Sequence, residues 1–174
     1  MQLDPKNELS EELRRTMRLW ATGVTVVTTQ FGQRRSGMTV SAFTSISLEP
    51  PRVLVLLQKE SVTCRLIRKS RIFAVSILGE GQEAISRQFA GLTALPEGAD
   101  RFNGVRFVSH STGSPVLADA LAWMDCRVLR VINAGTHYMI SGEVLATGRK
   151  ESRSRPLVYQ NRKYWRLAHS EPEI

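Results

Sequence analysis

Hydroxyl-bearing side chains concentrate in residues 37–51, which read GMTVSAFTSISLEPP. Thr39, Ser41, Thr44 and Ser45 fall within seven residues, and most positions around them are small or β-branched. This composition favours an extended backbone with little bulk for a core. The segment can hold a flat polar ligand against backbone amides and hydroxyls. The alternative is an edge strand whose hydroxyl-rich face meets solvent.

A second pair of hydroxyls, Ser61 and Thr63, stands where a short helix is expected to begin. A helix start combines capping hydroxyls with free backbone N–H groups, which together suit a phosphate. Arg65, Arg68 and Lys69 would add positive charge nearby. The alternative is that Ser61 only caps the helix.

Among the three histidines, His137 has the most suggestive setting, because Gly135 leads a turn directly before it. Such a turn would present the imidazole at the rim of a sheet, although the same pattern also fits a half-exposed histidine in a hairpin. His169 lies in a polar tail, and His110 follows a strand end between two serines.

A third candidate cluster combines residues 87–91 (RQFAG) with residues 100–102 (DRF). An arginine and an aromatic ring beside a loop could contact a nucleotide. The alternative is that the aromatic rings anchor the loop between the two segments.

Several common catalytic motifs are absent from the sequence. It contains no GxSxG elbow, HExxH motif or P-loop. Residues 79–84 (GEGQEA) share only the first two glycines of a dinucleotide fingerprint, so a Rossmann fold is not expected. Cys64 and Cys126 lie far apart without ligand-like neighbours, so we predict neither a disulfide framework nor a metal site.

The composition is that of one globular domain with an unusual charge. The 174 residues are 42% hydrophobic and 23% charged, with a formal net charge of +8. Anionic small molecules or nucleic acid could account for that charge, but no nucleic-acid motif accompanies the basic residues, so nucleic acid is the lesser alternative. No apolar run is long enough to span a membrane and the N-terminus lacks a signal peptide, which predicts a cytoplasmic protein.

Hydrophobic periodicity predicts a mainly β domain over residues 1–174. An amphipathic helix over about residues 5–20, capped by Asp4 and packed on another surface, precedes a barrel over about 23–167 and a polar tail over 168–174. Short helices are expected from Ser61 through Arg68 and near 82–90. Roughly eight hairpin-connected strands suggest an antiparallel barrel with helices at its rim. The stretch 37–51 is expected to pair back across the turn as a hairpin strand that Pro50 and Pro51 interrupt. The other expected strands cover residues 24–29, 52–58, 72–78, 106–109, 122–132, 137–147, 156–159 and 164–167.

Four motifs in register resemble the short-chain flavin reductases, the NAD(P)H:flavin oxidoreductase components of two-component flavin monooxygenases. The specific likeness is to the 4-hydroxyphenylacetate-monooxygenase reductase type, and it covers about residues 13–167. The motifs are residues 37–51, then 89–91 with 100–102, then 135–138 (GTHY) with 142–144 (GEV), then 156–159 (PLVY) with Tyr164.

This resemblance implies a homodimeric FMN-binding split barrel that reduces FMN or FAD with NADH or NADPH. The reduced flavin would supply a separate flavin-dependent monooxygenase. Hydride transfer is the cofactors' own chemistry, so the protein need only align the two rings and tune the flavin electrostatically, without an acid–base pair. The choice between NADH and NADPH, and between riboflavin, FMN and FAD, stays open.

The resemblance also implies roles for particular residues. His137 would be the catalytic candidate, a group that positions and polarises rather than an obligatory proton donor, and it would flank the nicotinamide together with Tyr164. Residues lining the flavin ring and the start of the ribityl chain would be Met38, Thr39, Val40, Ser41, Thr44, Ser45 and Ser47. Residues at the ribityl–phosphate and adenine end would be Gln58, Ser61, Thr63, Arg87, Phe89 and Ala90.

Three alternatives remain at this stage: a split-barrel flavoprotein that keeps FMN tightly bound and reduces another acceptor, a non-catalytic flavin-binding protein, and a basic nucleic-acid-binding barrel. Arg34 and Arg35, just before the first motif, are a candidate contact for a 2′-phosphate or a flavin phosphate. A simple basic hairpin turn is the alternative there.

Overall fold

The computed structural model describes residues 5–151 and 154–168, in which twelve strands and three helices are defined. In chain order these are α1 (Pro5–Met17), β1 (Thr22–Gly23), β2 (Thr25–Phe31), β3 (Arg34–Val40), β4 (Phe43–Leu48), β5 (Pro51–Gln58), α2 (Val62–Ser70), β6 (Ile72–Ile77), α3 (Glu83–Phe89), β7 (Phe107–Ser109), β8 (Pro115–Leu117), β9 (Ala122–Ala134), β10 (His137–Arg149), β11 (Val158–Gln160) and β12 (Lys163–Trp165).

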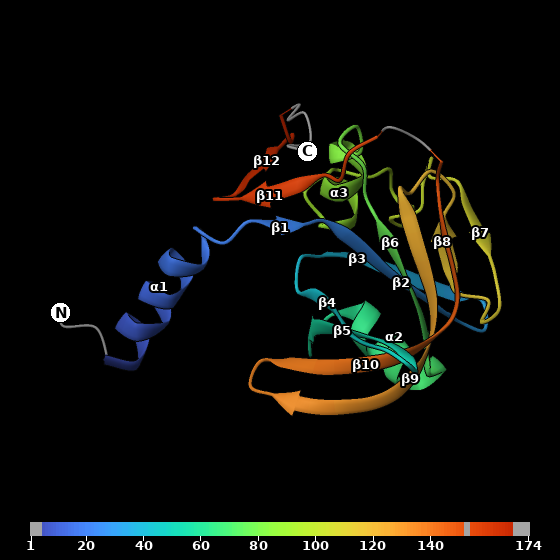
Figure 1. Cartoon of the computed structure of the whole chain (residues 1–174), viewed down its shortest axis with the longest axis horizontal. Helices are drawn as coiled ribbons and strands as arrows, with labels where there is room; N and C mark the ends of the chain where they lie inside the picture. Colours follow the sequence, from blue (N-terminus) through green and yellow to red (C-terminus); the bar gives the residue numbers. More distant parts are fainter. Residues whose placement is uncertain (1–4, 152–153, 169–174) are drawn as a thin grey trace, which may run out of the picture.

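Seven strands form one antiparallel sheet in the order β3-β2-β6-β9-β10-β5-β4 (Figure 1). A single cluster of buried side chains from both halves of this sheet fills its inside, including Val27, Val55, Phe73 and Ile140. The sheet is therefore curled around a core. No ladder joins β3 to β4 along the part of the chain that the structure describes, so the barrel is split between its two edge strands. The predicted mainly β, antiparallel split barrel is confirmed.

A second apolar cluster covers the outer face of the sheet beneath α3. Val26 points to this side and packs with Leu78, Phe89 and Leu157. Phe89 and Phe102 meet edge to face, with ring centroids 5.1 Å apart. This cluster fixes α3 and the loop that follows it against strand β2, and the end of α3 lines the candidate site.

The hairpin predicted around residues 31–37 is present, with β2 and β3 paired from Thr25↔Val40 to Phe31↔Arg34. One detail differs from the prediction. The return strand ends at Val40, and β4 begins at Phe43 to pair with β5 instead. Position 41 is a bend in the chain, which sends the hydroxyl-rich segment to the opposite edge of the split.

The two short helices α2 and α3 also follow the prediction. α2 begins after Ser61, whose hydroxyl accepts a hydrogen bond from the Cys64 N–H at 3.1 Å. The stripe of Thr63, Leu66 and Ile67 is buried against the sheet. α3 occupies Glu83–Phe89, within the predicted residues 82–90.

The described chain contains twelve strands, more than the roughly eight predicted. β1 and β8 have only two and three residues, too few to produce a periodic pattern. β9 and β10 run longer than predicted and form a hairpin that turns at Gly135 and Thr136. β11 and β12 form the last predicted hairpin around Asn161 and Arg162.

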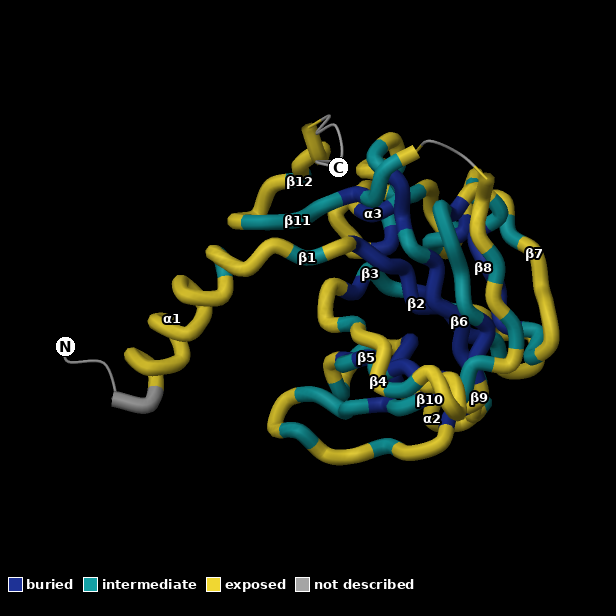
Figure 2. The backbone as a smooth tube through the Cα atoms, in the orientation of Figure 1, coloured by how far each residue is buried: buried dark blue, intermediate teal, exposed yellow. Residues whose placement is uncertain are grey.

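Helix α1 projects away from the barrel, and its whole described surface is exposed (Figures 1 and 2). It ends at Met17 rather than near Trp20, and Asp4, its predicted cap, lies outside the described residues. Leu9 is 73% and Leu13 is 60% exposed, so the predicted packing surface is not supplied by this chain. Across the described residues, no helix is long and apolar enough to cross a membrane.

Candidate functional site

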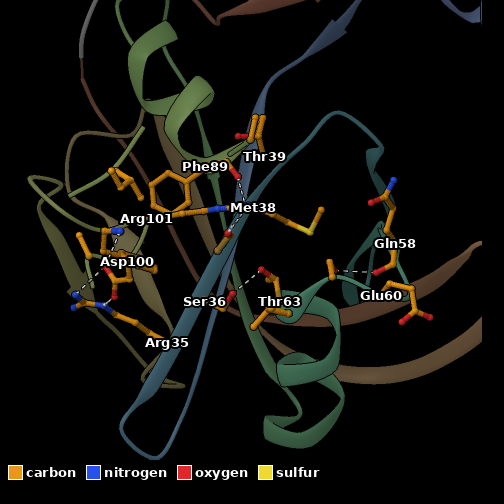
Figure 3. A pocket seen from close by; sticks show the side chains of 17 residues that line it. Arg35, Ser36, Met38, Thr39, Gln58, Glu60, Thr63, Phe89, Asp100 and Arg101 are labelled. Carbon is orange, nitrogen blue, oxygen red and sulfur yellow. Dashed lines mark hydrogen bonds and ion pairs between the residues drawn. The ribbon is translucent and has the colours of Figure 1, made fainter. Parts of the chain in front are cut away.

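The candidate site is a cavity of about 790 Å³ between strand β3, the start of α2 and the end of α3 (Figure 3). Its volume falls within the range of about 300–1,000 Å³ that is typical of ligand pockets. The loop at residues 95–102 closes one side. The lining residues are Arg35, Ser36, Gly37, Met38, Thr39, Gln58, Glu60, Ser61, Val62, Thr63, Phe89, Ala90, Leu95, Ala99, Asp100, Arg101 and Phe102.

One wall is strand β3, which is held against α3 with very little space between them. A Cβ atom at Gly37 would lie 2.7 Å from Cε1 of Phe89, so only glycine lets the buried Phe89 ring pack this closely. The Thr39 hydroxyl donates to the Ser86 carbonyl of α3 at 2.6 Å. At Gly37 the wall is therefore backbone alone, packed against Phe89, and Met38 extends into the cavity toward Gln58 (Figure 3).

The opposite side is the N-terminal end of α2. The first turn of a helix leaves backbone N–H groups without acceptors, here those of Val62 and Thr63, and both residues line the cavity. The Ser36 and Thr63 hydroxyl oxygens lie 2.9 Å apart, so one hydrogen bond ties β3 to this turn. The Ser61 hydroxyl donates to the Gln58 carbonyl at 2.9 Å while accepting from Cys64. Backbone donors at a helix N-terminus favour an anion.

The loop side is fastened by ionic groups. Asp100 receives two hydrogen bonds from Arg35, at 2.7 Å from Nε and 3.3 Å from Nη2. The bond from Arg35 holds the pKa of Asp100 below its ordinary value, although partial burial opposes that shift. The Arg35 guanidinium carbon also lies 4.9 Å from the ring centroids of both Phe102 and Phe107.

Arg101 joins the loop to the flat wall. Its Nη1 donates to the Phe89 carbonyl at 2.7 Å and to the Gly37 carbonyl at 3.3 Å. It also packs on Gly91, where φ is +75° and a Cβ would lie 2.8 Å from Nη2. Arg101 therefore holds the loop against β3 and α3 through two backbone carbonyls, whereas Arg35 holds the loop through its ion pair with Asp100.

Seven of the predicted site residues line this one cavity. They come from segments far apart in the sequence, which supports the prediction of a common slot. They are Met38, Thr39, Gln58, Ser61, Thr63, Phe89 and Ala90.

The remaining predicted residues lie outside the cavity lining. Val40 is 5% exposed and belongs to the barrel core, on the same face of β3 as Met38 but beyond the cavity lining. The hydroxyls on the other side of the bend are exposed or half-buried beside the β5 edge, where Thr44 donates to the Ser45 carbonyl at 3.1 Å. The residues on this side of the split are Ser41, Thr44, Ser45 and Ser47.

His137 begins β10 and pairs with Gln58 in the ladder with β5. Directly opposed residues project to the same face of a sheet, so His137 lies beside a cavity-lining side chain. Its Nδ1 is 2.8 Å from the Thr136 hydroxyl, and the residue is half-buried. His137 thus stands at the rim of the cavity.

Tyr164 and Arg87 lie behind α3 rather than in the cavity. The Tyr164 hydroxyl is 2.9 Å from the Ser86 hydroxyl, and Ser86 in turn accepts from Thr39. Arg87 donates to Glu83 at 2.9 Å and stacks over Tyr164 with its guanidinium carbon 5.5 Å from the ring centroid. These contacts hold α3 on the barrel.

Several cavity residues were missing from the predicted set. Ser36 could have been found, because it continues the hydroxyl-rich run by one position. Asp100, Arg101 and Phe102 were noted as a cluster whose role was open, and the structure makes them the fastening of the loop. Leu95 belongs to a loop without any periodic pattern, so no signal pointed to it.

The site does not contain the parts of a nucleophilic or metal-dependent enzyme. Burial raises the pKa of the Cys64 thiol, which lies behind the α2 turn, and raises that of Cys126 to about 12. Within residues 5–151 and 154–168, no group of three or more histidine, cysteine or acidic side chains could hold a metal ion. The cavity instead combines a flat wall with donors for an anion, and these features fit an aromatic ring that carries a phosphate.

The curled antiparallel barrel and its flat, anion-ready slot thus define a nucleotide-binding split-barrel protein. Comparison with known sequences narrows this class, since the model of the flavin reductase like domain matches residues 17–168. The chain belongs to this flavin reductase family.

Individual relatives agree with this assignment. The chain is 39% identical over 152 residues to an NADH-dependent FAD reductase of Streptomyces globisporus, covering 87% of this chain and 81% of the relative. It is 40% identical over 134 residues to the reductase component of a 4-nitrophenol 4-monooxygenase/4-nitrocatechol 2-monooxygenase of Rhodococcus opacus, covering 77% and 69%.

A solved structure shows the same fold. An NADH:FAD oxidoreductase from Streptomyces globisporus C-1027, in complex with NAD and FAD fragments, superposes with a TM-score of 0.83 at 34% identity. The match covers 99% of this chain and 98% of that chain. The resemblance read from the four motifs is confirmed.

Proposed function

We propose that this chain is an NAD(P)H:flavin oxidoreductase that reduces FMN or FAD with NADH or NADPH and supplies reduced flavin to a separate monooxygenase component. The observation that carries the proposal is the position of the α2 N-terminus at one end of a flat-walled cavity. A phosphorylated ring compound needs both features in one cavity, and the relatives named as FAD or FMN reductases support the identity of that compound.

The cavity lining fits a flavin nucleotide from its own chemistry. Gly37, Met38 and Thr39 would border the isoalloxazine ring, because all three line the cavity and Met38 supplies a polarisable surface. Ser61 and Thr63, with the first N–H groups of α2, would bind the phosphate. The flavin supplies the redox chemistry when it is bound.

The protein's own part in the reaction is then orientation and charge stabilisation. Backbone N–H groups along the wall and the positive end of the α2 dipole stabilise negative charge that develops on a bound ring. His137, beside Gln58 at the rim, would orient the nicotinamide from the open side of the slot. We also propose that Tyr164 and Arg87 act on the site only through their hold on α3.

We further propose that the protein is a homodimer. Leu9, Leu13 and Met17 form one exposed apolar stripe of α1, and Trp20 beyond it is 67% exposed. Two copies could bury these stripes against each other, which would supply the packing surface that the amphipathic pattern requires. The monomer would be one flavin-reductase domain that acts in the cytoplasm, where its nicotinamide nucleotide substrates are produced.

The experiment that tests the activity is a matrix of NADH and NADPH against riboflavin, FMN and FAD, with purified protein and oxidation of the nicotinamide as the readout. We expect turnover that depends on added flavin. Lack of turnover with every pair would refute the proposed function. A protein that stays yellow through gel filtration and ignores added flavin would instead be a flavoprotein with a resident FMN.

A further inference from the structure

A second cavity of about 700 Å³ lies beside the first, between the turn of the β2–β3 hairpin and the outer face of α2. The two cavities share Arg35, Val62 and Asp100 in their linings, so they adjoin each other. Figure 3 shows the hairpin running down beside α2 past the labelled Ser36 and Thr63. We call the second cavity the hairpin groove.

The hairpin groove is strongly basic. Its lining includes Arg34 from the hairpin and Arg65 and Lys69 from α2. Within the described chain, Arg34 and Lys69 form no ion pair, and the contact of Arg65 with Glu60 is long, at 3.7 Å, to a carboxylate that is 95% exposed. The groove therefore presents positive charge that the protein itself does not neutralise.

Arg35 also lines the groove, but unlike Arg34 its guanidinium is already bound within the protein. Its guanidinium is bound by Asp100 and lies against Phe102 and Phe107. Of the two adjacent arginines in the hairpin, Arg35 therefore holds the loop and Arg34 is free to bind. The sequence pattern alone could not separate these two roles.

The floor of the groove is apolar between its charges. Val62, Arg65, Leu66 and Lys69 are spaced three and four residues apart and form one stripe of α2. Val62 is 62% exposed, which provides a surface on which a flat base can lie. An apolar surface flanked by cations suits a purine nucleotide, whose ring is apolar on its faces and whose phosphates are anionic.

The junction of the two cavities is the start of α2, where Val62 lines both. A ligand whose phosphate is held by this turn can extend from the first cavity toward the basic hairpin groove, because Val62 lines both. We propose, on the basis of the proposed function, that the groove binds the phosphorylated adenosine end of a dinucleotide substrate, whether that end belongs to FAD or to the nicotinamide nucleotide.

The test uses the double variant Arg34→Gln/Lys69→Gln and a control with the same loss of charge, Arg130→Gln/Arg149→Gln. The control arginines are exposed on β9 and β10 and line neither cavity. Dissociation constants for FMN and FAD are measured from the quenching of flavin fluorescence, and KM values for NADH and NADPH are measured with FMN as the flavin.

If the groove takes the adenosine end of FAD, the double variant weakens FAD binding about tenfold and leaves FMN binding unchanged, since two exposed charge contacts are lost. If it takes the nicotinamide nucleotide, the ratio of FAD to FMN affinity stays constant and the KM for NADH or NADPH rises about tenfold. In either case the affinity of the wild-type protein for the affected ligand should fall as the salt concentration increases.

The proposal is overturned if none of the four constants changes, if FMN weakens as much as FAD, or if the control variant has the same effect. The two flavin dissociation constants do not depend on turnover, whereas the two KM values are measured on an active protein. Failure of the wild-type protein to oxidise NAD(P)H would refute the proposed function, whereas four unchanged constants in an active protein would refute only the hairpin groove.

Discussion

The Ser36 hydroxyl of β3 and the Thr63 hydroxyl of α2 lie 2.9 Å apart and join the flat wall of the cavity to its anion-binding end. Thr63 is only 2% exposed, so this bond is shielded from water. Thr63 belongs to a hydroxyl pair that the sequence singled out, whereas Ser36 stands one position before the hydroxyl-rich run of residues 37–51. Their contact fixes the distance between the ring-binding and phosphate-binding parts of the site.

Replacing Thr63 by valine keeps the shape of the side chain and removes this hydroxyl. We expect the dissociation constant for FMN to rise about fivefold, because a hydrogen bond contributes about 1 kcal/mol. Riboflavin, which has no phosphate, should bind as before. Thr147→Val is the matched control, since it removes a hydroxyl bond to the Trp123 carbonyl on β10, away from the cavity. Equal weakening of FMN and riboflavin would contradict a phosphate role for this turn.

Replacing His137 by alanine should raise the KM for the nicotinamide nucleotide about three- to tenfold, as expected for the loss of one polar contact at the rim. Flavin affinity should change little, because His137 does not line the flavin slot. Steady-state kinetics and flavin titration separate the two effects. His110→Ala is the control, since that ring stacks on Trp123 with centroids 3.9 Å apart. A rise in flavin Kd without a change in KM would refute the assigned role.

Local sequence signals predicted the parts of the site that form locally. The β-branched run before residue 31 and the turn after it specified the β2–β3 hairpin, and Ser61 marked the start of α2. Both depend on contacts within a few residues. The break after Val40 was missed because the small, hydroxylated residues around it suit a continuous strand as well as a bend.

Contacts between residues far apart in the sequence could not be predicted from these local signals. Arg35 and Asp100 are 65 positions apart, and Arg101 reaches back 64 positions to Gly37. Nothing in the local pattern around Arg35 distinguishes it from Arg34, although one is paired and the other is free. The fine structure of the site therefore rests on long-range pairing, whereas its general chemistry could be read from short motifs.

The Arg35–Asp100 pair predicts a pH dependence of stability. The pKa of Asp100 is lowered in the folded state from 3.8, so the pair stabilises the fold above that value and loses its effect as the pH falls through the lower folded-state pKa. Asp100→Asn should therefore reduce the free energy of unfolding by up to about 1 kcal/mol at about pH 7, given the partial exposure of both groups. Urea denaturation should give equal stabilities for wild type and variant well below the folded-state pKa. A difference that persists there would show that charge is not its cause.

Replacing Gly37 by alanine should disturb both stability and flavin binding. The new Cβ would lie 2.7 Å from the Phe89 ring and 3.0 Å from Cγ2 of Thr28, and Phe89 is fully buried. Overpacking of this kind costs about 1–3 kcal/mol, and a shift of the Phe89 ring would change the cavity that it lines. Gly81→Ala is the control, because nothing lies within 4 Å of a Cβ there. A melting temperature equal to that of wild type would contradict the close packing of β3 on α3.

The apolar stripe of α1 allows a test of the proposed dimer interface. Leu9 and Leu13 are four residues apart on one helical face, and both are exposed in the single chain. If a second copy covers them, the double variant Leu9→Glu/Leu13→Glu loses about 1.5–3 kcal/mol of burial per side chain. The dimer dissociation constant should then rise by more than about 100-fold, measured by sedimentation equilibrium. Asn7→Glu/Arg14→Gln changes the net charge equally on the polar face and should leave the dimer intact. A wild-type protein that sediments as a monomer would contradict the proposed dimer. A leucine variant that dimerises as tightly as wild type would show that α1 does not form the interface.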